Sequence, residues 1–351
     1  RVVTRRADGG LDQHVLSIDD EPHDVEFGAN EQWDTSVLRL THQSLTTPVR
    51  VVDVDVATGA VTVVKQTPTP NVDLSQYVAE RRWATAPDAT QVPVKIARHV
   101  DTPLDGTAPC CLYGYGSYEI SMPPWFSVAR LSLLDRGVVW ALAHPRGGGE
   151  LGRQWYLDGK LLTKRNTFTD ALAVSEHLVA SGASARDRLA IRGGSAGGLL
   201  VGACITMEPE RFRSAVAEVP FVDIVTTMSD PSLPLTVTEW EEWGDPRDEP
   251  YASYMLTYSP YDLTVPAAYP ALLVTAGLND PRVSYHEPAK WTAKLRAERT
   301  HEAPLLLQTQ RGAGHAGPAM GAMLAALDVT AESARHLCLY GTVRGVLAAA
   351  V

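Results

Sequence analysis

Residues 192–200 read RGGSAGGLL and place four glycines around one serine, Ser195. Apolar residues precede and follow this stretch, which predicts a strand before the serine and a helix after it. Glycine is costly inside regular elements, so the cluster indicates a turn that needs backbone freedom or a close approach. Gly193 to Gly197 fit G-x-S-x-G, the pattern of a sharp turn that lifts a serine hydroxyl above a sheet edge. The sequence predicts Ser195 as a nucleophile; the alternative is a tight turn that happens to hold a serine.

A serine nucleophile needs a base that is itself oriented by a carboxylate. On this kind of fold the acid and then the histidine follow the serine, each in a loop after a strand. The segment ALLVTAGLNDPRV places Asp280 just after one strand, and PLLLQTQRGAGHAG places His315 just after the next. We expect Asp280 and His315 to complete a triad, with His144 and His286 as competing histidines.

Negative charge that develops in the transition state must meet fixed hydrogen-bond donors. The backbone N–H of Ala196, the residue after the nucleophile, is one expected donor. The segment CCLYGYGSY follows an earlier strand and offers the phenol of Tyr115 as a second donor. Ordinary packing at a strand end is the alternative for Tyr115.

Apolar strand-like runs alternate with helical stretches through the chain after residue 100. Strands are predicted at 110–115, 138–144, 188–193, 214–220, 271–277 and 304–310. Such runs, separated by helices and preceded by a hairpin at 77–100, predict an α/β-hydrolase fold, a mostly parallel sheet covered by helices. We place this catalytic domain at 71–351.

The segment TFTDALAVSEHLVASG, at 167–182, has helical periodicity. Thr167 and Asp170 suit its first turn, and Gly182 suits its end. Before the linker at 67–76, residues 34–66 alternate as short strands and predict an antiparallel β unit.

Composition excludes several classes of function. The net charge of -10 argues against a nucleic-acid binder, and no apolar run approaches the length of a membrane span. The four cysteines include no CxxC pair, which suits a reducing, cytoplasmic compartment. The sequence also lacks HExxH, so we expect neither a metal nor a cofactor.

The segment TVTEWEEWGDPRDEP, at 236–250, concentrates acidic residues among tryptophans. A charge run of this kind is usually a solvated face. The sharper interpretation is a pocket for a cationic side chain, because a desolvated carboxylate can hold a guanidinium through two hydrogen bonds.

Six motifs together resemble the prolyl oligopeptidase family of serine peptidases, and the oligopeptidase B subfamily in particular. They are LYGYGSY, HPRGGGELGRQWY, RGGSAGGLL, TEWEEWGDP, GLNDPRVSYHEPAKW and GAGHAG. The resemblance covers roughly residues 75–340. It implies an α/β-hydrolase domain joined to a β-propeller. It also implies that residues 1–70 are the C-terminal remnant of that propeller plus a linker, with the missing propeller portion as a partner.

Carried over by motif, the resemblance implies the Ser195, Asp280 and His315 triad and Tyr115 as oxyanion donor. It implies that Arg282 contacts the backbone of a bound peptide. The position of Glu239 is aromatic in prolyl-cleaving members and acidic in oligopeptidase B, whose members cut after Arg or Lys. Glu241 falls where that subfamily has a second acidic group.

One stretch departs from the subfamily pattern. EISMPPWFS places Pro123 and Trp125 where enteric members have aspartates that serve the next subsite. A strong preference for paired basic residues is therefore not implied, although Glu119 lies close by. The sequence predicts a serine oligopeptidase that cuts short basic peptides through an acyl-enzyme. The alternatives are an esterase or acylaminoacyl peptidase with the same triad, and a non-catalytic propeller-type binding module.

Overall fold

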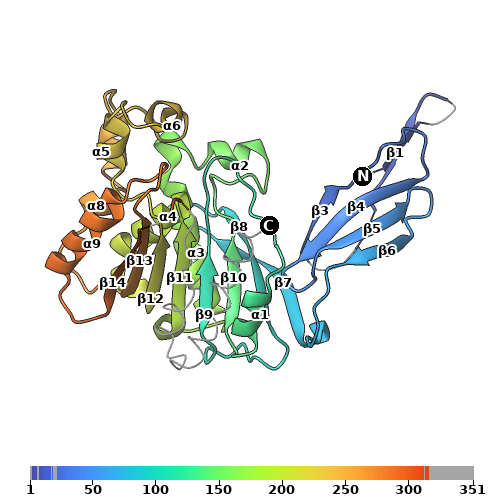
Figure 1. Ribbon diagram of the computed structural model, residues 1–351, viewed down its shortest axis with the longest axis horizontal. Coiled ribbons are helices and arrows are strands. Elements are labelled where there is room, and N and C mark those ends of the chain that lie inside the picture. Colours follow the sequence, from blue (N-terminus) through green and yellow to red (C-terminus); the bar gives the residue numbers. More distant parts are fainter. Residues whose placement is uncertain (1, 6–7, 17, 19–21, 312, 316–351) are drawn as a thin grey trace.

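The computed structural model describes residues 2–5, 8–16, 18, 22–311 and 313–315. Its main element is an eight-stranded sheet with the order β14-β13-β12-β11-β9-β10-β8-β7 (Figure 1). The strands are β7 (Tyr77–Thr85), β8 (Gln91–His99), β9 (Cys110–Tyr113), β10 (Val139–Ala143), β11 (Leu189–Gly194), β12 (Ser214–Glu218), β13 (Ala271–Gly277) and β14 (Leu305–Gln310). Strands β9 to β14 pair in parallel, whereas β8 is antiparallel to both β7 and β10. The predicted α/β-hydrolase fold is confirmed.

Helices cover both faces of this sheet. Helix α1 (Val128–Leu134) packs on one face, and α3 (Arg165–Ala180), α4 (Ala196–Met207) and α9 (His286–Glu298) pack on the other. Successive strand residues point to opposite faces, so Cys110 belongs to one buried cluster and Cys111 to the other. Both faces are therefore apolar, which is why these strands read as continuous apolar runs.

The remaining helices lie in the connections between strands. They are α2 (Arg153–Leu157), α5 (Ile224–Ser229), α6 (Thr236–Trp243), α7 (Tyr251–Met255) and α8 (Pro260–Leu263). Figure 1 shows α2, α5 and α6 at the top of the view, beyond one end of the strands. Among the described residues, no helix combines the length and the apolar character that a membrane crossing requires.

Helix α3 begins at Arg165, two residues before the predicted start. Thr167 and Asp170 do not cap it, because both side chains bind a neighbouring loop. The Thr167 hydroxyl donates to the Arg146 carbonyl over 2.6 Å, and the Asp170 carboxylate accepts from the Arg146 guanidinium over 2.6 and 2.9 Å. The predicted end is right, since Gly182 follows the helix with a φ of +75°.

An antiparallel sheet of four strands precedes the main sheet and lies at its β7 end (Figure 1). It contains β3 (His23–Phe27), β4 (Val37–Ser44), β5 (Arg50–Asp55) and β6 (Val61–Gln66), and a separate ribbon contains β1 (Val2–Arg5) and β2 (Leu11–His14). The strands expected within 34–66 are present as β4 to β6. Strands β1 to β3 lie in a region without clear alternation and were not predicted.

The connection between the two sheets includes a short 3-10 helix, η1 (Leu74–Gln76). Leu45, just beyond β4, is fully buried in the cluster that α1 covers, and the Phe126 N–H donates to the Gln43 side chain over 3.2 Å. The β unit therefore contacts the main domain beside α1. The division at residue 70 falls within this connection and stays a prediction.

Candidate active site

Ser195 occupies the turn between β11 and α4, as the sequence predicts. Its backbone has a φ of 58° and a ψ of −119°, a strained conformation for a residue with a side chain. The end of β12 holds this strained turn in place, because the Ser195 N–H donates to the Glu218 carbonyl over 2.8 Å. The Phe221 N–H donates to the Ser195 carbonyl over 3.2 Å. The hydroxyl is thus presented where strand and helix meet.

The glycines around Ser195 are required by close backbone approach. A Cβ at Gly193 would overlap the carbonyl of Gly197, and one at Gly197 would come within 2.7 Å of the Gly114 carbonyl. A Cβ at Gly198 would overlap Pro220. The glycine cluster thus permits a turn too tight for larger residues.

Asp280 and His315 form the second part of the site. Asp280 Oδ2 lies 2.7 Å from His315 Nδ1. Asp280 Oδ1 accepts the N–H groups of Arg282 and Val283 over 2.8 and 3.0 Å. The Asp280 side chain is 1% exposed, so its carboxylate interacts with groups of the protein and not with solvent. This geometry holds the imidazole with Nδ1 toward the carboxylate and leaves Nε2 for a proton transfer.

Hydrogen bonds between two loops fix the position of this pair. The Leu278 and Asn279 N–H groups donate to the carbonyls of Gln310 and Ala313 over 3.0 and 3.2 Å. The Asn279 side chain donates to the Arg311 carbonyl over 3.1 Å. The loops after β13 and β14 therefore run together, as neighbouring parallel strands allow.

Ser195 and Asp280 line one cavity of about 580 Å³. In the described part of the chain, no hydrogen bond joins the Ser195 hydroxyl to His315. Asp280 and His315 are therefore in contact, whereas the predicted base and the predicted nucleophile are not hydrogen-bonded to each other. Catalytic hydrogen bonds in unliganded enzymes often tighten only when substrate binds.

The two competing histidines are engaged elsewhere. His144 is 1% exposed, and its Nδ1 lies 3.0 Å from a Glu150 carboxylate oxygen. His286 Nδ1 lies 2.9 Å from the hydroxyl of Ser284. Of these three histidines, His315 is the one that contacts Asp280.

The two predicted oxyanion donors line the cavity that Ser195 also lines. Tyr115 and Ala196 line the same cavity, and the Tyr115 ring would lie 3.3 Å from a Cβ at Gly197. The Ala196 N–H begins helix α4 and has no hydrogen-bond partner among the described residues. Burial and, next, the charge of Glu239 raise the pKa of Tyr115 to about 12, so its phenol remains a donor at neutral pH.

Glu239 lines the cavity from helix α6. Its Oε2 accepts the Tyr118 hydroxyl over 2.6 Å and the Trp243 indole N–H over 2.7 Å. Its Oε1 has no partner in the described part of the chain. A carboxylate with one oxygen held and the other free is suited to bind a cationic group.

Glu241 is exposed and does not line this cavity, because it lies two residues along the helix from Glu239. Its contribution to binding stays a prediction. Arg282 lines the cavity and is exposed, and its guanidinium has no partner among the described residues. It is therefore available to a ligand.

The stretch at 119–127, which departs from the oligopeptidase B pattern, lies beside the site. Glu119 forms an ion pair with Arg153 of α2. The Trp125 ring packs 5.3 Å from the Arg130 guanidinium and 5.9 Å from the Tyr113 ring, and Pro123 does not line the cavity. Glu119 is therefore paired within the protein, and neither Pro123 nor Trp125 supplies a carboxylate.

Sequence reasoning missed the residues that support the cavity wall. Tyr118 and Trp243 hold Glu239, and Lys164 lies behind them, paired with Glu242. Glu287 is 4% exposed, lines the cavity and accepts the Thr227 hydroxyl over 2.6 Å. An acidic residue three positions after Glu239 was visible, but the lysine that pairs with it lies 78 residues away in the chain.

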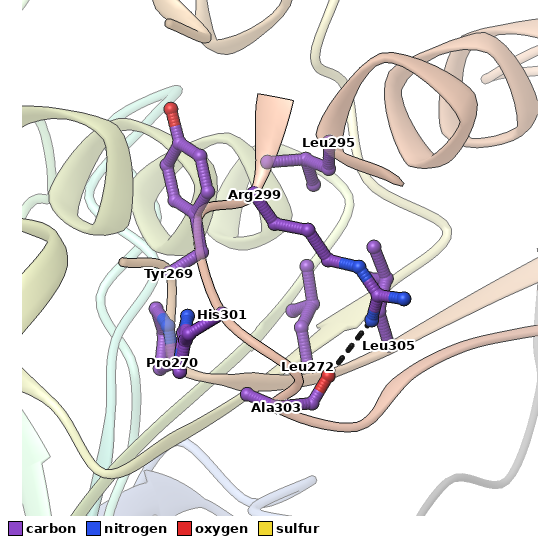
Figure 2. A pocket seen from close by; sticks show the side chains of 8 residues that line it. All are labelled: Tyr269, Pro270, Leu272, Leu295, Arg299, His301, Ala303 and Leu305. Atoms are coloured by element: carbon purple, nitrogen blue, oxygen red, sulfur yellow. Dashed lines mark hydrogen bonds between the residues drawn. The ribbon is translucent and has the colours of Figure 1, made fainter. Parts of the chain in front are cut away.

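A second cavity lies between β13, β14 and α9 (Figure 2). Tyr269, Leu295 and Arg299 are among its lining residues, and its volume of about 10 Å³ admits roughly one water. The larger cavity is therefore the candidate substrate site.

Within the residues that the structure describes, no three His, Cys, Asp or Glu side chains gather closely enough to hold a metal ion.

Comparison with known proteins adds to this geometry. Residues 124–331 match the prolyl oligopeptidase family. The chain is 48% identical to dipeptidyl aminopeptidase BI of Pseudoxanthomonas mexicana over 313 residues, which are 89% of this chain and 43% of the relative. It is 45% identical to protease 2 of Moraxella lacunata over 312 residues, 88% of this chain and 45% of the relative. The chain thus spans less than half the length of these curated relatives.

Solved structures show the same similarity. Oligopeptidase B from Leishmania major superimposes with a TM-score of 0.82 at 42% identity, over 95% of this chain and 46% of that one. Oligopeptidase B from Trypanosoma brucei, with covalently bound antipain, superimposes with a TM-score of 0.81 at 44% identity. That match covers 89% of this chain and 45% of that structure.

Proposed function

The chain belongs to the prolyl oligopeptidase family, and from this premise we propose that the protein is a serine peptidase that cleaves short peptides after Arg or Lys. The observation that carries the proposal is Glu239, whose held carboxylate lines the cavity that also contains Ser195. The similarity to two solved oligopeptidase B structures supports it further.

In the proposed reaction, Ser195 Oγ attacks the carbonyl carbon of the scissile bond while its proton passes to His315 Nε2. The tetrahedral oxyanion accepts hydrogen bonds from the Tyr115 hydroxyl and the Ala196 N–H. As the C–N bond breaks, His315 returns the proton to the leaving amine and an acyl-enzyme remains. Water, deprotonated by His315, attacks the ester, and the proton goes back to Ser195 as the acid product leaves.

Asp280 has a supporting role in this scheme. Its 2.7 Å contact with Nδ1 fixes the imidazole tautomer and stabilises the imidazolium that forms in each half-reaction. Its second oxygen accepts two backbone N–H groups, so the carboxylate cannot turn away. Removing any member of the triad is expected to lower kcat by several powers of ten.

Substrate recognition is assigned to three side chains. Glu239 Oε1 binds the cationic side chain, Glu241 adds negative charge nearby, and Arg282 contacts the peptide backbone. The apolar lining of the cavity suits the methylene stem of Arg or Lys, since Phe221 and Met228 both lie there. The preferred substrates are therefore short basic peptides.

Reporter substrates test this proposal on the natural full-length protein. Arginyl, lysyl, prolyl and acyl-alanyl reporters with one common leaving group are compared for kcat/KM. We expect the arginyl and lysyl reporters to be cleaved fastest, and Glu239→Gln to lower their kcat/KM by about a hundredfold. A faster acyl-alanyl reporter would instead favour the esterase or acylaminoacyl peptidase alternative.

A covalent probe tests the remaining alternative, a non-catalytic binding module. A fluorophosphonate is expected to label the wild type and not Ser195→Ala, since the serine oxygen forms the bond to phosphorus. An unlabelled wild type would contradict the peptidase proposal.

One relative bears the name dipeptidyl aminopeptidase BI, so the mode of cleavage is tested separately. Arginyl reporters with free and with blocked amino termini distinguish the removal of dipeptides from internal cleavage.

The proposal includes the N-terminal residues. We assign residues 1–70 to the end of a β-propeller, because a four-stranded antiparallel sheet is the form of one blade. The side chains of Phe27 and Trp33 are 80% and 102% exposed. The missing propeller portion would cover these apolar side chains. A cytoplasmic location also stays a prediction.

A further inference from the structure

Lys164 is a buried cation that the proposed reaction does not use. Its side chain is 0% exposed at the start of helix α3. Its ammonium group donates to the Gly116 carbonyl over 2.7 Å and to the Ser117 hydroxyl over 2.8 Å. It also lies 3.4 Å from Glu242 Oε1. Burying an ammonium is costly unless it is paired, so this arrangement requires its carboxylate partner.

Glu242 forms its hydrogen bonds and its ion pair with groups inside the protein. It is 3% exposed, and its Oε1 also accepts the Tyr118 N–H over 3.2 Å. Its Oε2 accepts the Tyr156 hydroxyl over 2.8 Å. Both oxygens therefore have protein donors, and Lys164 balances the charge.

Glu239 differs from Glu242 although both lie on helix α6, three positions apart. Residues at this spacing are neighbours on a helix surface, so two uncompensated carboxylates there would repel each other. Lys164 pairs with Glu242 and leaves Glu239 with a free oxygen at the cavity. Of these two carboxylates, one is therefore internal and the other is available to a ligand.

The groups that hold Glu239 are themselves held by the buried pair. Tyr118 donates its N–H to Glu242 and its hydroxyl to Glu239. Trp243 donates to Glu239, and its ring lies 4.8 Å from the Lys164 ammonium. Each donor to Glu239 therefore also contacts Lys164 or Glu242.

We propose that Lys164 and Glu242 are positioning residues that orient Glu239 and balance the charge behind it, and so set the preference of the cavity for cationic side chains. This inference rests on the proposed function. It predicts that the net charge of the pair, and not only its shape, controls substrate choice.

Glu242→Gln is the first test, because it keeps the shape and an acceptor while it leaves the Lys164 ammonium uncompensated behind Glu239. On the natural full-length protein, we expect kcat/KM for an arginyl reporter to fall about tenfold, mainly through KM. An alanyl reporter with the same leaving group should change by less than about threefold. An equal loss for both reporters, or an unchanged arginyl preference, would overturn the inference.

A second substitution tests charge balance directly. Lys164→Met in the Glu242→Gln background restores neutrality, so we expect the arginyl preference to recover toward the wild-type ratio. A purely structural role predicts that the double variant is worse than the single one, and that result would count against the inference. Lys160→Met in the same background is the matched control. Lys160 lies 4.6 Å from the Tyr156 ring but forms no ion pair with Glu242 in the described part of the chain, so its removal should not restore the arginyl preference.

The outcomes separate this inference from the proposed function. A wild-type protein without preference for the arginyl reporter contradicts the proposed function. A wild-type preference that Glu239→Gln abolishes and Glu242→Gln leaves intact contradicts only the positioning role. If the double variant does not fold, the selective loss in Glu242→Gln alone still decides the question.

Discussion

Gly277, at the end of β13, lies against the carbonyl of Gly314, so closely that a Cβ at position 277 would overlap that oxygen. The contact brings the end of β13 against the loop that carries His315. Gly314 itself is less constrained, because among the described residues the closest atom to a Cβ there is the Asn279 carbonyl oxygen, at 3.8 Å. Two glycines in contact therefore differ sharply in their tolerance of a side chain.

Gly277→Ala is expected to displace the loop of His315 and lower kcat by about a hundredfold, since small misplacements of a catalytic group have effects of this size. Gly314→Ala is the matched control and should keep kcat within about threefold of the wild type. Steady-state kinetics with an arginyl reporter measure both variants. Equal activity of the two would show that the contact at Gly277 does not position the base.

Tyr115→Phe tests the oxyanion donor. Loss of one such donor typically lowers kcat by about 10²–10³-fold, and the same loss is expected here with little change in KM. Because the pKa of Tyr115 is raised to about 12, wild-type activity should show no loss from its ionisation below about pH 11.

Tyr113→Phe is the control for this prediction, since Tyr113 packs between Trp125 and Trp140 on the other side of the strand end. Its kcat should match the wild type. A Tyr115→Phe variant with full kcat would leave the Ala196 N–H as the main donor.

Local patterns predicted the sheet and the loops that carry the proposed triad. Each strand predicted between 77 and 310 is present, because a parallel sheet buried on both faces imposes continuous apolar runs that end where loops begin. Ser195, Asp280 and His315 could be located because each follows such a run. The contact of Asp280 with His315 then follows from the pairing of β13 and β14.

Tertiary contacts explain what local patterns did not predict. Thr167 and Asp170 resembled helix caps, but each binds Arg146, so their chemistry serves a loop and not the helix end. The acidic segment at 236–250 did not distinguish Glu239 from Glu242. That distinction depends on Lys164, which is distant in the chain and carries no local signal of its own.

Glu287 is predicted to make stability depend on pH. Burial raises its pKa to about 7, although Val222, Asp223 and Thr227 donate hydrogen bonds to it. The folded state therefore binds more protons than the unfolded state between the ordinary value of 4.5 and about pH 7. Stability from this group is present at low pH and is lost as pH rises through that window.

Glu287→Gln should remove this contribution, since the amide does not titrate. We expect the unfolding free energy of the wild type, measured against that of Glu287→Gln, to fall by about 3 kcal/mol between pH 4.5 and pH 8. Urea unfolding at four pH values measures the difference. Glu302→Gln is the control, because its side chain is 93% exposed and stays in water on folding. A constant difference between wild type and Glu287→Gln across this range would contradict the prediction, whereas a falling one assigns the pH dependence to the carboxylate that joins α9 to the cavity wall at α5.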